Sequence, residues 1–245
     1  MTSIAIARIA RITGDPDLLE VAEAAAEELL SDRSGNPYIA MSAKHSLSLV
    51  AVQKGDRSAA EEHYGYLLGQ RGAMSMAGPL DRILGLLSQT MGNLDQAADH
   101  FEEALAFCGK AGYRPDLAWT CCDYADPLLR RDGHGDRAKA ITLLEESLAI
   151  SSELGMRPLM ERATERLERA QSAPVRVPAY PDGLTQREVE VLRSLASGKS
   201  NLEIAEELFI SLNTVARHLT NIFGKIGATN RVEAANYASR HGLSR

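Results

Sequence analysis

A run of polar side chains between positions 211 and 225 has the spacing of one face of a helix. Asn213, Arg217 and Asn221 recur every four residues, and the segment contains no Asp or Glu. Amide, hydroxyl and guanidinium groups without neighbouring carboxylates can donate hydrogen bonds to base edges and to phosphate oxygens. The chemistry predicted for this segment is recognition of double-stranded DNA. A polar face of this length is also compatible with a solvated helix surface, so the pattern alone leaves both interpretations open.

The apolar residues of the same segment indicate how the helix is held. Four of them would pack on a core from the opposite face: Val215, Leu219, Ile222 and Ile226. Three further short helices are expected, because each has a Ser, Thr or Asn start signal with Glu three residues later. These signals are Thr185 with Glu188, Ser200 with Glu203, and Asn230 with Glu233. A three-residue turn between a helix ending near Leu208 and one starting near Leu212 predicts a helix-turn-helix.

The spacing of residues 184–243 resembles the LuxR-type (NarL/FixJ-type) helix-turn-helix of bacterial transcription regulators. The matching stretches are Leu184-Thr185-x-Arg187-Glu188-x-Glu190-Val191-Leu192, Gly198-x-Ser200-Asn201-x-Glu203-Ile204-Ala205, Ser211-x-x-Thr214-Val215-x-x-His218-x-x-Asn221-Ile222, Lys225-Ile226-Gly227 and Asn230-Arg231. The resemblance implies a module of four helices that binds operator DNA with its third helix.

The resemblance and the polar face together give twelve candidate DNA-contacting residues. They are Lys199, Ser200, Asn201, Ser211, Asn213, Thr214, Ala216, Arg217, Thr220, Asn221, Lys225 and Arg231. The family usually has Lys or Arg where this chain has Ala216, and often a basic residue at Thr220. Arg217 is therefore the expected base-reading residue, because a guanidinium can bond both acceptors of guanine at once. Lys225 is expected to hold a phosphate on the exposed side of the helix.

The first 170 residues indicate a repeated helical hairpin. Gly followed by Asp or Asn occurs at positions that include 14, 55, 92 and 135, and prolines suited to a first helical turn occur at 37, 79, 115 and 158. In the segment 92–105, Ala97, Phe101 and Ala104 alternate small, large and small. The segment resembles a tetratricopeptide repeat (TPR), although the units are longer and less regular, so the array is TPR-like. Pro127 is expected to kink or break its helix.

The expected fold is all-α, with a TPR-like array over 1–171, a Pro-containing linker over 172–183 and a LuxR-type domain over 184–245. The 245 residues carry a net charge of −6, yet residues 184–245 hold eight Lys and Arg against six Asp and Glu. No apolar run is long enough to span a membrane. Arg8 and Arg11 interrupt the first apolar stretch, which argues against a secretory signal. These two arginines are expected on a polar outer face of the first helix.

Three cysteines, at 108, 121 and 122, are too few for a disulfide framework and are expected to be core residues in a reducing compartment. The predicted location is the cytoplasm. The spacing of Ser, His, Cys and acidic residues indicates no catalytic centre and no metal or cofactor site. We therefore expect no enzymatic activity, cofactor or metal.

These features favour a transcriptional regulator that binds operator DNA as a homodimer. Its TPR-like part would offer a surface to a protein, a peptide or another subunit. The order of the two parts resembles the C-terminal half of the large ATP-binding LuxR regulators. The alternative is a TPR-type interaction scaffold whose helix-turn-helix no longer binds DNA specifically, because a basic residue is missing at Ala216.

Overall fold

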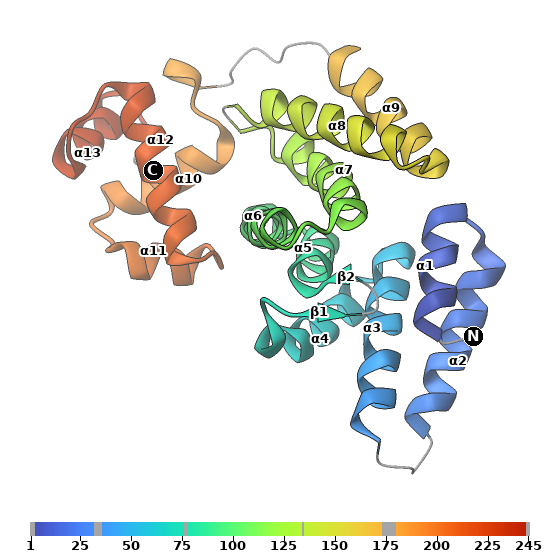
Figure 1. Cartoon of the computed structure of the whole chain (residues 1–245). Helices are drawn as coiled ribbons and strands as arrows, with labels where there is room; N and C mark the ends of the chain where they lie inside the picture. The colour runs from blue at the N-terminus through green and yellow to red at the C-terminus, as the bar shows by residue number, and fades with distance from the viewer. Residues whose placement is uncertain (1–2, 32–35, 76–77, 134, 173–179, 244–245) are drawn as a thin grey trace. The chain divides into compact units, whose positions relative to one another are not determined.

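The computed structural model describes residues 3–31, 36–75, 78–133, 135–172 and 180–243 (Figure 1). In those ranges it contains thirteen α-helices and one antiparallel pair of two-residue strands, which confirms the all-α fold. None of the helices described is long and apolar enough to cross a membrane. Contacts divide the chain into two compact units, Met1–Arg130 with Ala138–Gln171 and Arg131–Arg137 with Ser172–Arg245. Residues 173–179 of the expected linker lie outside the described residues.

Up to Ser172, the described residues contain nine α-helices. They are α1 (Ser3–Thr13), α2 (Pro16–Ser31), α3 (Pro37–Lys54), α4 (Arg57–Leu67), α5 (Leu80–Met91), α6 (Leu94–Ala111), α7 (Arg114–Arg131), α8 (Asp136–Glu153) and α9 (Arg157–Ser172). A 3₁₀ turn (Leu68–Gln70) and the strand pair β1 (Met74–Ser75) and β2 (Gly78–Pro79) connect α4 to α5. The helices α1, α2 and α3 pack side by side in Figure 1.

The glycine turns have the backbone conformation that the repeat pattern requires. Gly55 and Gly92 end α3 and α5 with φ of 66° and 88°, a left-handed conformation that residues with a Cβ adopt at a cost. After the first of these turns, the Asp56 side chain accepts a hydrogen bond from the Ala59 N–H at 3.0 Å and caps α4. The turn signals in the sequence therefore act locally, as expected.

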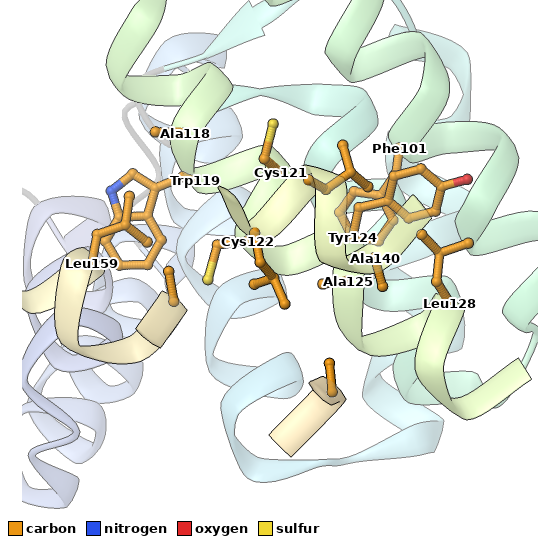
Figure 2. Close-up of a cluster of buried hydrophobic side chains, with 14 of the residues drawn as sticks. Phe101, Ala118, Trp119, Cys121, Cys122, Tyr124, Ala125, Leu128, Ala140 and Leu159 are labelled. Atoms are coloured by element: carbon orange, nitrogen blue, oxygen red, sulfur yellow. The ribbon is translucent and has the colours of Figure 1, made fainter. Parts of the chain in front are cut away.

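The small and large positions of the expected repeat pack as predicted. Ala97, Phe101 and Ala104 are fully buried on α6. A Cβ added at Gly85 of α5 would lie 2.9 Å from Phe101 Cε2, so the ring occupies the space that this glycine leaves. The same ring stacks on Tyr124 of α7 with centroids 5.3 Å apart, in the cluster that Figure 2 shows. The relation of this array to TPR proteins stays a prediction.

The three cysteines lie in the core, as expected. Cys108, Cys121 and Cys122 are buried free thiols, and Figure 2 shows the last two among the apolar side chains of the cluster. Burial raises the pKa of Cys122 to about 11, with opposing charges from Arg166 and Asp123 around it. A thiol with such a pKa stays protonated near neutral pH and is a poor nucleophile.

Two features of the first unit differ from the sequence prediction. The helix α7 does not break at Pro127 but runs from Arg114 to Arg131, because Pro127 is buried and packing on neighbouring helices outweighs the lost backbone hydrogen bond. Arg11 does not lie on an outer face of α1. Its Nη2 donates to Asp123 Oδ1 on α7 at 2.6 Å, and its side chain is largely buried.

The second unit contains a 3₁₀ turn (Pro181–Gly183) and four short helices: α10 (Gln186–Ala196), α11 (Asn201–Glu207), α12 (Leu212–Ile226) and α13 (Arg231–Arg240). Capping boxes form at Thr185 and Ser200, and Ser211 and Asn230 cap α12 and α13. The helices close on a core that includes Val189, Leu192 and Ile222. All four predicted helix starts are confirmed.

Candidate DNA-binding interface

The turn between α11 and α12 sets the angle at which the two helices meet. Phe209 adopts a φ of 52°, the left-handed conformation in which a helix commonly ends. The Ile210 N–H then donates to the Ala205 carbonyl at 3.0 Å and closes the turn. Ser211 caps the next helix by accepting from the Thr214 N–H at 3.1 Å. A helix-turn-helix is thus built from local hydrogen bonds that each hold one end of a helix.

The buried face of α12 fixes which side chains remain outside. Val215, Leu219 and Ile222 are buried in the core of the second unit, and Ile226 packs against it. His218 is also buried on this side, consistent with a structural role. The periodicity therefore leaves the other face of α12 open to solvent, as the sequence predicted.

The outer face of α12 carries four exposed candidate residues and one that is half-buried. The exposed ones are Asn213, Ala216, Thr220 and Asn221, and Arg217 lies beside them at intermediate exposure. The Thr220 hydroxyl donates to the Ala216 carbonyl at 3.0 Å within the helix. A hydroxyl in this position can still accept a hydrogen bond from outside. We call these five residues the recognition face.

Thr214 does not belong to this face. Its side chain is fully buried, and its backbone N–H is part of the cap of α12. The position therefore serves the start of the helix and not a DNA contact. The sequence pattern did not separate these roles, because a Thr in a first helical turn fits both.

The structure also differs from the sequence prediction in the position of the Lys225 side chain. Its Nζ donates to Glu188 Oε2 at 2.6 Å and to the Gly183 carbonyl at 2.8 Å, with the two side chains only 9% and 3% exposed. The Lys225 ammonium thus joins the end of α12 to the start of α10. Glu188 accepts from the Thr185 N–H at 2.8 Å in its capping box as well. A cation held this way is not available to a phosphate.

The remaining cationic candidates surround the start of α11. Arg231 donates through Nη1 to Asn201 Oδ1 at 3.3 Å and through Nη2 to the Lys199 carbonyl, which ties α13 to α11. The Lys199 ammonium pairs with Glu207, and this contact lowers the pKa of the Glu207 carboxyl. Ser200 and Ser211 are exposed caps of their helices. These residues form the flank of the recognition face.

One apolar feature of the interface was not predicted from the sequence. Phe209 is 81% exposed in the turn, and Leu212 is 51% exposed in the first turn of α12. Large exposed apolar side chains beside a polar face can contact apolar parts of a partner, such as a thymine methyl group. The sequence does not give the exposure of Leu212, because its spacing of three residues to Val215 and seven to Leu219 places it on the apolar stripe of α12.

Comparison with known proteins agrees with this geometry. The family described as "Bacterial regulatory proteins, luxR family" matches residues 182–238. The C-terminal unit contains a LuxR-type helix-turn-helix domain. The matched residues run from the 3₁₀ turn into α13 and so include all four helices of the LuxR-type domain, α13 up to Ala238.

Several curated proteins are similar to the LuxR-type domain. The transcriptional regulatory protein LiaR of Bacillus subtilis is 50% identical over 62 residues, which are 25% of this chain and 29% of that protein. The Fimbriae Z protein of Salmonella typhimurium is 52% identical over 60 residues, 24% and 29% of the two chains. The CsgBAC operon transcriptional regulatory protein of Escherichia coli is 54% identical over 56 residues, 23% and 26% of the two chains. The chain thus spans less than a third of the length of these relatives. No solved structure matches the chain.

Proposed function

We propose that this protein is a bacterial transcriptional regulator that binds operator DNA through its LuxR-type domain. The observation that carries the proposal is the recognition face, an exposed helix surface without carboxylates in a domain whose relatives are regulatory proteins. Such a surface presents donors to the major groove and does not repel the phosphates beside it. The site of action of such a regulator is the cytoplasm, where the bacterial chromosome lies.

The recognition face divides into residues for bases and residues for the DNA backbone. Arg217 reads guanine through two hydrogen bonds, and Asn213, Thr220 and Asn221 contact neighbouring bases or phosphates. The flank at the start of α11 holds the phosphates through its exposed caps and through Lys199. Lys225 and Thr214 have no part in this interface, because both are buried.

Binding sites are identified first, by chromatin pull-down and sequencing with the full chain. Affinity for the strongest site and for a scrambled duplex is then measured at several salt concentrations. A regulator discriminates between the two duplexes, and the affinity for both falls as salt rises. Equal affinity for the two duplexes under all conditions would contradict operator binding.

We propose the domain division that the sequence predicts, with a TPR-like array over 1–171, a linker over 172–183 and the LuxR-type domain over 184–245. We assign to the first unit a TPR-like role in binding a protein, a peptide or a second subunit, since its helical hairpins resemble such arrays.

Homodimerisation on DNA follows from the short reach of one helix-turn-helix, and paired half-sites are the usual solution. Val232 on α13, 69% exposed, offers one apolar contact. Light scattering of the complex tests this, and a 1:1 complex on a full operator would refute it.

A second candidate function is an interaction scaffold that has lost specific DNA binding. It is favoured by the ion pairs of two basic residues that were expected to contact DNA. Lys225 is in a buried ion pair with Glu188, and Lys199 is paired with Glu207. A scaffold would show no preference for the chromatin-derived site, and Arg217→Ala would leave its weak DNA affinity and its salt dependence nearly unchanged.

A further inference from the structure

The first unit contains a cleft whose walls carry an excess of positive charge. Its lining comes from α1, α3, α5, α7 and α9 and from the turn at Gly55, and its volume is about 350 Å³. Volumes of this size hold small organic ligands. The charged lining residues are Arg11, Arg130 and Arg166 with Asp123 and Asp126. A smaller cavity that shares Arg11 adds Arg8 and Arg82 to the same region.

Asp123 is the centre of this charge arrangement. Its buried carboxylate contacts Arg11 at 2.6 Å, Arg82 at 2.8 Å and Arg166 at 3.9 Å. Asp126, one third exposed, pairs with Arg166 at 2.7 Å. Two carboxylates thus face three guanidinium groups, and Arg130 lines the same cleft as a fourth. Two carboxylates cannot neutralise four guanidinium groups, so the region stays cationic in a place where water is partly excluded.

The Arg11 guanidinium lies among other positive charges. Burial lowers the pKa of the Arg11 guanidinium, Asp123 counteracts this, and Arg82, Arg162 and Arg166 repel its charge. A negative group in the cleft would reduce this repulsion.

We propose that this cleft binds a small organic oxyanion among the arginines that line it. The negative group relieves the repulsion among these arginines. Arg130 is exposed and contributes a further charge at the opening, where its Nη1 lies 3.5 Å from the Gln89 carbonyl. The ligand class is a carboxylate or phosphate ester of small size.

Binding of an anion in the cleft can be tested without DNA, because a ligand that binds the folded chain raises its melting temperature. Melting temperature is measured against rising succinate and, separately, inorganic phosphate, with ionic strength held constant by chloride. Succinamide, which has the same shape without charge, is the matched ligand control. We expect a saturable rise with at least one anion and none with succinamide. A larger response to succinate indicates a carboxylate ligand, and a larger response to phosphate indicates a phosphate ester.

Two variants test the location of the site. Arg130→Gln is exposed and should fold normally, while the apparent dissociation constant of the anion rises about tenfold, the loss expected for one charge-assisted contact. Lys110→Gln makes the same charge change at an exposed residue of α6 that does not line the cleft, and it should leave the dissociation constant unchanged. Absence of any saturable rise, an equal effect of succinamide, or equal constants for the two variants would overturn the proposal.

Discussion

The ion pair between Lys225 and Glu188 provides the sharpest test of the LuxR-type domain. Replacing Lys225 with Met keeps much of the side-chain volume and removes the ammonium. Glu188 then stays buried as a carboxylate whose strongest partner is gone, although the Thr185 N–H still donates to it. Breaking one side of a buried pair costs about 3–5 kcal/mol, and the remaining hydrogen bonds place the expected loss near the lower end.

A loss of about 3 kcal/mol lowers the melting temperature of a domain of this size by roughly 12–24 °C. Hydrogen exchange of peptides from 184–243 follows this domain in the full chain. Trp119, the one tryptophan of the sequence, lies in the first unit, so its fluorescence reports whether that unit is unaffected. We expect faster exchange in the C-terminal peptides and unchanged tryptophan unfolding. Thr220→Ala, on the exposed face of the same helix, is the control and should change neither signal.

The double variant Lys225→Met with Glu188→Met decides between an ion pair and a DNA contact. Replacing both charges by apolar groups should restore part of the lost stability, because the uncompensated carboxylate is gone while the capping hydrogen bond from the Thr185 N–H is lost as well. A phosphate contact behaves differently. It would leave exchange unchanged in Lys225→Met, weaken binding to every duplex alike and reduce the salt slope by about one. That pattern would refute the structural role assigned to Lys225.

Three other substitutions test separate parts of the molecule. Arg217→Ala should cost about 1–3 kcal/mol on the cognate duplex and relax preference at one base pair, and unchanged discrimination in a binding series would contradict base reading. Ala97→Leu should destabilise the first unit by about 1–3 kcal/mol in denaturant unfolding, because Ala97 is fully buried and a larger side chain must displace its neighbours; an unchanged midpoint would oppose this. Burial alone would raise the pKa of Asp123, but Arg11, Arg82 and Arg166 outweigh it and hold that pKa well below its usual range. The carboxylate therefore stabilises the first unit above the unfolded-state value of about 3.9, and this contribution is lost as pH falls through the folded-state pKa. Asp123→Asn should be less stable than the native chain at neutral pH and the difference should shrink in strong acid; a constant difference would count against the pair.

Local signals in the sequence determined the elements and the outward face of α12. A cap acts on N–H groups two or three residues away, so Ser200, Ser211 and Asn230 could be read directly. The apolar period of α12 selects its buried side without knowledge of the partner helices. The exposure of Asn213 and Asn221 follows from that period alone, and the comparison with LuxR-type proteins agrees with the helices so predicted.

Tertiary structure alone decided which charges are neutralised. Glu188 and Lys225 are 37 residues apart. Local structure alone accounts for each of them, because Glu188 caps the start of α10 and Lys225 is a basic residue in the last turn of α12. Arg11 and Asp123 are 112 residues apart, and nothing in the period of either helix links them. Helix periodicity gives the side on which a residue lies but not the helix that will cover it. Ion pairs between distant helices therefore depend on how the helices pack, and so do the buried Lys225 and the cationic cleft.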